Sequence, residues 1–195
     1  MTKDSQRSTR RARGPGESAL LLLDAIEILN RHGVRYAVVG AMAAAVYGAV
    51  RATTYADALL GIAVSRLEGL HRVFFEAGFS SELRRGGNDD PLGGMLILTD
   101  ESGNCVELIA GIRGMDPAAF ERRREVPFEG VSLHVVGLED FIAMKCFAGG
   151  PLDLADARQA LNAADSPVRI DLVRRLARRF GRPAADALER LLDES

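Results

Sequence analysis

The segment from Tyr36 to Val64 constrains the fold of this chain more than any other part of the sequence. It begins with a short apolar run ending at Val39, continues through an alanine-rich run that stops at Gly48, and ends with a second apolar run from Ala58 to Val64. Short apolar runs bounded by glycine are typical of buried strands, and an alanine-rich run that stops at glycine is typical of a helix. The sequence therefore predicts a strand, a helix and a second strand in close succession, with Asp57 at the start of the second strand.

Gly40 lies at the junction between the first predicted strand and the helix. The first N–H groups of a helix have no partner inside it, and the helix dipole is positive at that end. Such a junction favours an anion such as phosphate. Gly40 is therefore a candidate phosphate-binding residue.

A motif from Arg51 to Asp57, with the letters RATTYAD, follows this helix. Together with the glycine turn and Gly48, it resembles the nucleotidyltransferase fold of the DNA polymerase β superfamily, in the branch of AbiEii-type toxins and minimal nucleotidyltransferases. Those proteins usually have Gly-Gly or Gly-Ser at the turn, where this chain has Gly40-Ala41, and Arg-x-Thr-x-Asp-x-Asp in the motif. Tyr55 therefore stands in the place of the first metal-binding aspartate.

The resemblance implies an α/β (α+β) fold, in which a mixed β-sheet nucleotidyltransferase core is flanked by helices and followed by a C-terminal helical extension. It also implies that the nucleoside triphosphate is bound by residues of the glycine turn and the motif, namely Gly40, Ala41, Arg51 and Thr53.

A predicted hairpin carries a further candidate carboxylate. Its strands run from Met95 to Leu98 and from Val106 to Ile109, and Glu107 lies between apolar neighbours on the second strand. A buried carboxylate needs a cation, a metal or hydrogen bonds, whereas a glutamate on an edge strand needs none of these, and the sequence leaves both readings open. In the resembled family a carboxylate on such a strand binds metal. The resemblance therefore implies that Asp57 and Glu107 are catalytic ligands of Mg²⁺, in a metal site impaired by Tyr55.

A second motif lies near the C-terminus, where the family often has a lysine on a helix followed by Asp-x-x-Asp. This chain has Lys145, Asp153 and Asp156 at the matching places, but Gly150 and Leu152 where the family has Arg and Lys. The resemblance implies a catalytic role for Lys145 as a partner of phosphate or of a carboxylate, and nucleotide binding by the two aspartates. The residues alone also allow a lysine that reaches solvent and two helix-capping carboxylates.

Two further helices are predicted in the core. The amphipathic run from Ser18 to His32 closes at Gly33, and Ser65 and Glu68 have the spacing of a capping box at the start of another helix.

Composition divides the chain into three segments. Residues 1–16 are polar and basic, and we expect a disordered tail, either solvated or in contact with RNA. Residues 17–137 form the expected nucleotidyltransferase-like core, and residues 138–195 a helical segment packed on the core. Four arginines between Arg174 and Arg179 give this segment a basic surface, which is either solvated or a docking face for tRNA.

Charge and cysteine content exclude several classes of protein. A net charge of −2 does not indicate a polyanion partner, and Cys105 and Cys146 form no CxxC motif, so a zinc site is not expected. The sequence has no signal peptide and no run long enough to span a bilayer, which predicts a cytoplasmic protein without a membrane partner.

Two function classes follow from the resemblance. The first is transfer of a nucleoside monophosphate from a triphosphate to RNA, tRNA or a small-molecule hydroxyl, with a cognate antitoxin protein as a further expected partner. The second is a catalytically inactive member that binds a nucleotide, RNA or a protein partner. The sequence leaves open whether the protein is an active enzyme.

Overall fold

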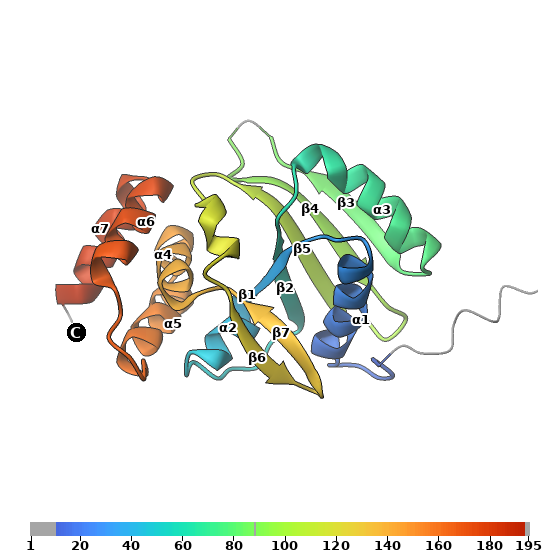
Figure 1. Ribbon diagram of the computed structural model, residues 1–195, viewed down its shortest axis with the longest axis horizontal. Helices are drawn as coiled ribbons and strands as arrows, with labels where there is room; N and C mark the ends of the chain where they lie inside the picture. Colours follow the sequence, from blue (N-terminus) through green and yellow to red (C-terminus); the bar gives the residue numbers. More distant parts are fainter. Residues whose placement is uncertain (1–10, 88, 194–195) are drawn as a thin grey trace, which may run out of the picture. The chain divides into compact units, whose positions relative to one another are not determined.

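The computed structural model describes residues 11–87 and 89–193 (Figure 1). The described residues contain seven strands in one mixed sheet, in the order β3-β4-β5-β2-β1-β7-β6, together with seven α-helices and two short 3₁₀ helices. This architecture confirms the α/β fold expected from the sequence. In chain order the elements are α1 (Ser18–Arg31), β1 (Tyr36–Val39), α2 (Gly40–Val46), β2 (Tyr55–Leu60), η2 (Val64–Arg66), α3 (Leu67–Glu76), β3 (Ser80–Arg85), β4 (Leu92–Thr99), β5 (Cys105–Ile112), η3 (Pro117–Phe120), β6 (Arg124–Phe128), β7 (Val131–Val135), α4 (Leu138–Ala148), α5 (Pro151–Asn162), α6 (Ile170–Phe180) and α7 (Arg182–Asp193).

The chain forms two compact units. Of the described residues, 11–37 and 52–112 belong to the first unit, and 38–51 and 113–193 belong to the second. The division falls inside β1, whereas the sequence suggested a boundary at residue 138. Each unit is described by itself below.

In the first unit, β2 pairs in parallel with β5, and β5 and β3 pair antiparallel with β4. Helix α1 packs against β2 and β5, and α3 packs against β3 and β4 (Figure 1). Side chains of a strand alternate between the two faces of the sheet. Alternate residues of the two central strands are accordingly buried, namely Ala56, Ala58, Val106, Leu108 and Ala110.

The second strand of the opening segment begins earlier than the sequence predicts. We expected it from Ala58 to Val64, but β2 spans Tyr55–Leu60. Pairing with β5 extends the strand back to Tyr55, although that residue is exposed. The strand ends where the N–H of Gly61 donates to the carbonyl oxygen of Arg35, at 2.8 Å. Asp57 therefore lies within the strand rather than at its start.

Part of the predicted tail is held in place. Residues 1–10 lie outside the described part of the chain, but Arg11 donates from its backbone N–H and its guanidinium to Asp24 of α1, at 3.0 and 2.8 Å. The side-chain amide of Asn104 donates to the carbonyl oxygen of Gly14, at 2.8 Å. The expectation of disorder therefore does not hold for residues 11–16, because α1 and the loop before β5 supply polar partners for them.

Ser18 joins three segments of the first unit, and its replacement by alanine should lower stability. Its hydroxyl, buried at the start of α1, donates to Thr54 O at 2.7 Å and accepts from the N–H of Cys105 at 3.0 Å. Ser18→Ala leaves both backbone groups without this partner, so we expect the free energy of unfolding in urea to fall by about 1–3 kcal/mol. Ser80→Ala changes an exposed serine in the same unit and should cost less than about 0.5 kcal/mol. Equal effects of the two changes would contradict this assignment.

The second unit combines a short β-ribbon with a helical cluster. Val38 of β1 pairs in parallel with Val135 of β7, and β7 forms a hairpin with β6 through a turn at Glu129 and Gly130, both with positive φ. Helix α4 packs against α5, α6 and α7 (Figure 1). Gly181 separates the last two helices, α6 and α7. None of the helices in the described ranges is long and apolar enough to cross a membrane.

Candidate functional site

Asp57 and Glu107 are register partners on the adjacent parallel strands β2 and β5. Register partners project their side chains from the same face of a sheet. Both side chains are half-buried, and their neighbours in sequence point to the opposite, helix-covered face. Because β5 lies between β2 and β4, Glu107 is not on an edge strand. We call the side of the sheet that carries these two residues the carboxylate face.

A third acidic residue shares the carboxylate face but is already paired. Glu82 of β3 lies in the same row as Glu107, with Ile97 of β4 between them. Its carboxylate accepts from Nε of Arg84 at 2.8 Å. Sequence analysis missed these two residues, although the alternation of polar and apolar residues along β3 places them on one face. Because Glu82 pairs with Arg84, the part of the carboxylate face that lies on β3 is close to neutral.

The electrostatic environment of Cys105 shows that carboxylate charge gathers at this end of β2 and β5. Burial raises the pKa of the Cys105 thiol, and the negative charges of Glu107 and Asp57 raise that pKa further. Arg84 has a smaller, opposite effect on the same thiol. Both carboxylates therefore act on the same thiol, which agrees with their placement on adjacent strands.

Tyr55 lies next to this site. It is the register partner of Cys105, it projects from the carboxylate face two residues before Asp57, and its side chain is 51% exposed. A phenol is neutral near neutral pH and is a poor ligand for a hard cation. The position that the resembled family gives to an aspartate is thus filled by a group that adds no charge.

The donor set fits a Mg²⁺ ion only in part. Mg²⁺ is commonly bound by one or two carboxylates together with water and substrate phosphates, so Asp57 and Glu107 could hold one ion with a bound nucleotide. Within residues 11–87 and 89–193, no group of three or more His, Cys, Asp or Glu side chains is placed to hold a metal ion. The residues present do not fit a site with three carboxylate ligands.

A second cluster of predicted residues forms within the second unit. The ammonium of Lys145 on α4 lies 2.8 Å from Oδ1 of Asp153 and 2.8 Å from Oδ2 of Asp156, both on α5. Arg51, in the linker after α2, lies 3.5 Å from Oδ2 of Asp156. Lys145 is only 7% exposed, so the reading in which this lysine reaches solvent is wrong. Four residues predicted from two separate motifs are therefore in contact.

The cluster is compact because Gly150 precedes α5. A Cβ atom at Gly150 would lie 2.9 Å from Oδ2 of Asp153, so a larger residue would displace that carboxylate. Lys145 donates a hydrogen bond to Asp153, whereas Oδ2 of Asp156 has its cations within ion-pair distance but not in hydrogen-bonding geometry. The pairing of Arg51 with Asp156 and the role of Gly150 could not be found by sequence analysis, because they depend on how α5 packs.

The structure also describes the other residues that the sequence predicts to bind a nucleotide. Gly40 is the first residue of α2, as expected, and its φ of 61° is in the region that favours glycine. Ala41 is buried, with 5% of its surface exposed. The hydroxyl of Thr53 donates to the carbonyl oxygen of Tyr55 at 2.9 Å and so shapes the chain just before β2. Gly40, Ala41 and Arg51 belong to the second unit, and Thr53 to the first.

Comparisons with known proteins identify the fold. No protein-family model matches the chain, and no curated protein matches it in sequence. A nucleotidyltransferase-like antigenic protein from Paracoccidioides brasiliensis is similar in structure, with a TM-score of 0.60 and 14% identity over 94% of this chain and 91% of that one. The antibiotic-resistance factor ANT(2″)-Ia gives a TM-score of 0.58 and 12% identity over 92% of this chain and 98% of its own. The chain has the nucleotidyltransferase fold.

Two further solved structures support this result. A candidate nucleotidyltransferase from Thermotoga maritima has a TM-score of 0.55 and 20% identity over 79% of this chain and 98% of that one. ANT(2″)-Ia in complex with adenylyl-2″-tobramycin has a TM-score of 0.56 and 12% identity over 84% of this chain and 96% of that one. The fold expected from the sequence is therefore confirmed.

Proposed function

We propose that this protein is a nucleotidyltransferase-like protein that binds a nucleoside triphosphate with Mg²⁺ at the carboxylate face and transfers nucleoside monophosphate slowly. The observation that carries the proposal is the register pairing of Asp57 with Glu107 on two parallel strands of this fold. Slow transfer follows from Tyr55, which removes one carboxylate from the expected metal site. The alternative is binding without transfer, and it is favoured because residues 11–87 and 89–193 contain no group of three His, Cys, Asp or Glu side chains placed to hold a metal ion.

The two carboxylates would bind the cation and orient it toward the phosphates. When bound, Mg²⁺ would supply positive charge to the triphosphate and stabilise the departing pyrophosphate. Nucleotide binding by Gly40, Ala41 and Arg51 of the second unit, and by Thr53 of the first, remains a prediction from the resemblance. We further propose that Asp156 holds the side chain of Arg51 in place, and that Lys145 and Asp153 in turn hold Asp156.

A small-molecule hydroxyl is the acceptor that we favour. Its support is the structural likeness to ANT(2″)-Ia, which has been solved with adenylyl-2″-tobramycin. Transfer to RNA or tRNA, membership of the AbiEii branch and an antitoxin partner remain predictions from the resemblance. A cytoplasmic location is also a prediction, for which the two free, buried cysteines provide modest support.

Nucleotide binding can be tested by thermal unfolding with each triphosphate and Mg²⁺. A ligand present at a hundred times its dissociation constant stabilises the folded state by about 2.7 kcal/mol. For a chain of this length such a gain should raise the melting temperature by roughly 5–10 °C. Asp57→Asn and Glu107→Gln should each remove most of this shift, because each leaves the cation with one carboxylate.

The same preparations can be assayed for transfer, with α-labelled triphosphates offered to tobramycin and to bulk tRNA. We expect slow labelling of the small molecule or none. Rapid labelling that Asp57→Asn abolishes would show that the metal site is intact and contradict impairment. If no triphosphate shifts the melting temperature of the wild type, the proposal of nucleotide binding is wrong.

A further inference from the structure

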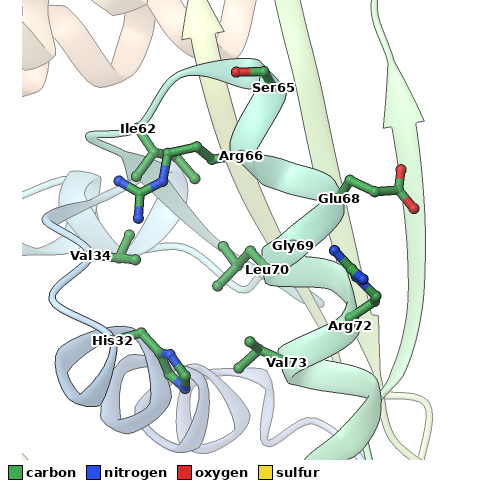
Figure 2. A pocket seen from close by; sticks show the side chains of 10 residues that line it. All are labelled: His32, Val34, Ile62, Ser65, Arg66, Glu68, Gly69, Leu70, Arg72 and Val73. Carbon is green, nitrogen blue, oxygen red and sulfur yellow. The ribbon is translucent and has the colours of Figure 1, made fainter.

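A pocket with a volume of about 370 Å³ lies in the first unit, away from the carboxylate face (Figure 2). Its lining comes from the end of α1, the loop after β2 and the first two turns of α3. No residue of β2, β3, β4 or β5 lines it. Binding pockets for small molecules typically have volumes of about 300–1,000 Å³, so this pocket has room for a ligand of the size of a mononucleotide.

The pocket has an apolar wall. Val34 and Leu70 are each 6% exposed, and Ile62 and Val73 are half-buried. Figure 2 shows Val34, Leu70 and Val73 around the same space. Gly69 adds no side chain, and a Cβ atom there would meet no heavy atom within 4 Å. A flat, weakly polar group such as a nucleobase can therefore lie against this wall.

Two arginines give the pocket a positive charge. Arg66 and Arg72 lie on opposite sides of Leu70 in Figure 2, and both are exposed. Neither guanidinium group makes an ion pair or a hydrogen bond to any residue that the structure describes. Glu68, the acidic residue in the lining, pairs instead with Arg85 at 2.8 Å. The negative charge of Glu68 is thus compensated outside the pocket, while the two guanidinium groups remain available.

The start of α3 adds an unused hydroxyl. The sequence predicts a capping box between Ser65 and Glu68, but α3 begins at Leu67 and no side chain caps its N-terminus. The preceding 3₁₀ turn and the pair of Glu68 with Arg85 replace the predicted cap. Ser65 and His32 also line the pocket, at opposite ends of it in Figure 2.

We infer that this pocket is a second binding site, for a nucleoside monophosphate, separate from the carboxylate face. The phosphate contacts Arg66 and Arg72, and the base packs on the wall formed by Val34, Leu70 and Val73. Guanidinium groups bind phosphate through strong, charge-assisted hydrogen bonds. The combination of two uncompensated arginines with an adjoining apolar wall selects a phosphate attached to a flat, apolar body over a free ion or an uncharged molecule.

The site can be tested by titrating the full chain with AMP while the amide signals are followed by NMR. EDTA is present throughout, so that metal-dependent binding at the carboxylate face does not contribute. We expect shifts at Gly69, Leu70 and Val73. Adenosine and inorganic phosphate should each bind at least about tenfold more weakly than AMP, because each lacks half of the contacts.

Variants separate this site from the rest of the protein. Arg66→Gln and Arg72→Gln should each weaken AMP binding about tenfold, and Gly69→Leu should abolish it by filling the space. Arg175→Gln changes an exposed arginine of α6 and should have no effect, and neither should Asp57→Asn. The two Arg→Gln variants alter exposed side chains only, so they decide the question if Gly69→Leu does not fold.

Three results would overturn the inference. AMP binding that survives Arg66→Gln and Arg72→Gln together would show that the arginines do not hold the phosphate. Adenosine binding as tight as AMP binding would show the same. Loss of binding in Asp57→Asn would move the site to the carboxylate face. Failure of nucleotidyl transfer would leave this inference untouched, because AMP binding is measured without metal or turnover.

Discussion

Tyr55→Asp is expected to increase the affinity of the protein for Mg²⁺ or Mn²⁺ by at least about tenfold, since an added carboxylate brings a further oxygen ligand and a negative charge close to the cation. Tyr55 projects from the same face as Asp57 and Glu107, so an aspartate there joins them in one group of three. The backbone of Tyr55 makes the hydrogen bonds with Thr53, and the exposed phenol takes no part in them. This turn should therefore survive the change.

Without metal, the same variant should be less stable than the wild type. Added metal should stabilise the variant more than it stabilises the wild type. Three carboxylates on one face repel one another, and this raises the pKa of at least one of them and lowers the stability of the free protein. A divalent cation removes the repulsion. Thermal unfolding in EDTA and in Mg²⁺ should therefore give a larger difference in melting temperature for Tyr55→Asp than for the wild type, and the transfer assay should show faster labelling.

Matched variants make this result specific. Tyr55→Phe removes only the phenolic hydroxyl and should behave like the wild type in both measurements. Tyr55→Asp combined with Asp57→Asn restores the original number of carboxylates and should lose the gain in metal affinity. If Tyr55→Asp binds Mg²⁺ no better than the wild type, then position 55 is not part of a metal site and the resemblance of the motif ends at Asp57.

The sequence predicted elements whose signals are local. The strand, glycine and helix around Gly40 and the hairpin carrying Glu107 each follow from apolar runs and turn residues that are close in sequence. The neighbouring placement of β2 and β5 is not local, and the expectation came from the resemblance to a known family. The exact start of β2 was missed because Tyr55 is exposed, while the pattern of the sequence marks only the buried end of the strand.

Contacts that depend on packing between elements distant in sequence could not be predicted from the sequence. Arg51 and Asp156 are more than a hundred residues apart in sequence, and their ion pair exists because α5 packs beside the linker after α2. The pocket at Gly69 is formed by a helix end and a helix start that carry no shared motif. In the same way, Glu68 had the spacing of a capping residue but pairs with Arg85 on β3, a residue that only the fold brings near.

Lys145→Met is expected to lower the free energy of unfolding by about 3–5 kcal/mol, because removing one partner of a buried ion pair leaves the other charge uncompensated. Lys145 is 7% exposed and Asp156 is 5% exposed. Without the lysine, Asp156 would keep Arg51, at 3.5 Å from one oxygen, and Asp153 would lose its ion pair. At roughly 2–4 °C per kcal/mol for a chain of this length, the melting temperature should fall by about 10 °C.

Two comparisons test whether the loss of stability comes from an uncompensated buried charge. Arg174→Met breaks an exposed ion pair with Glu189, 2.9 Å long, and should cost less than about 1 kcal/mol. In Lys145→Met the buried carboxylate of Asp156 loses the lysine. Adding Asp156→Asn removes that negative charge, so the double variant should be more stable than Lys145→Met alone. If Lys145→Met keeps the stability of the wild type but loses nucleotide binding, then the lysine contacts the substrate, and its ion pairs with α5 are not what holds α4 and α5 together.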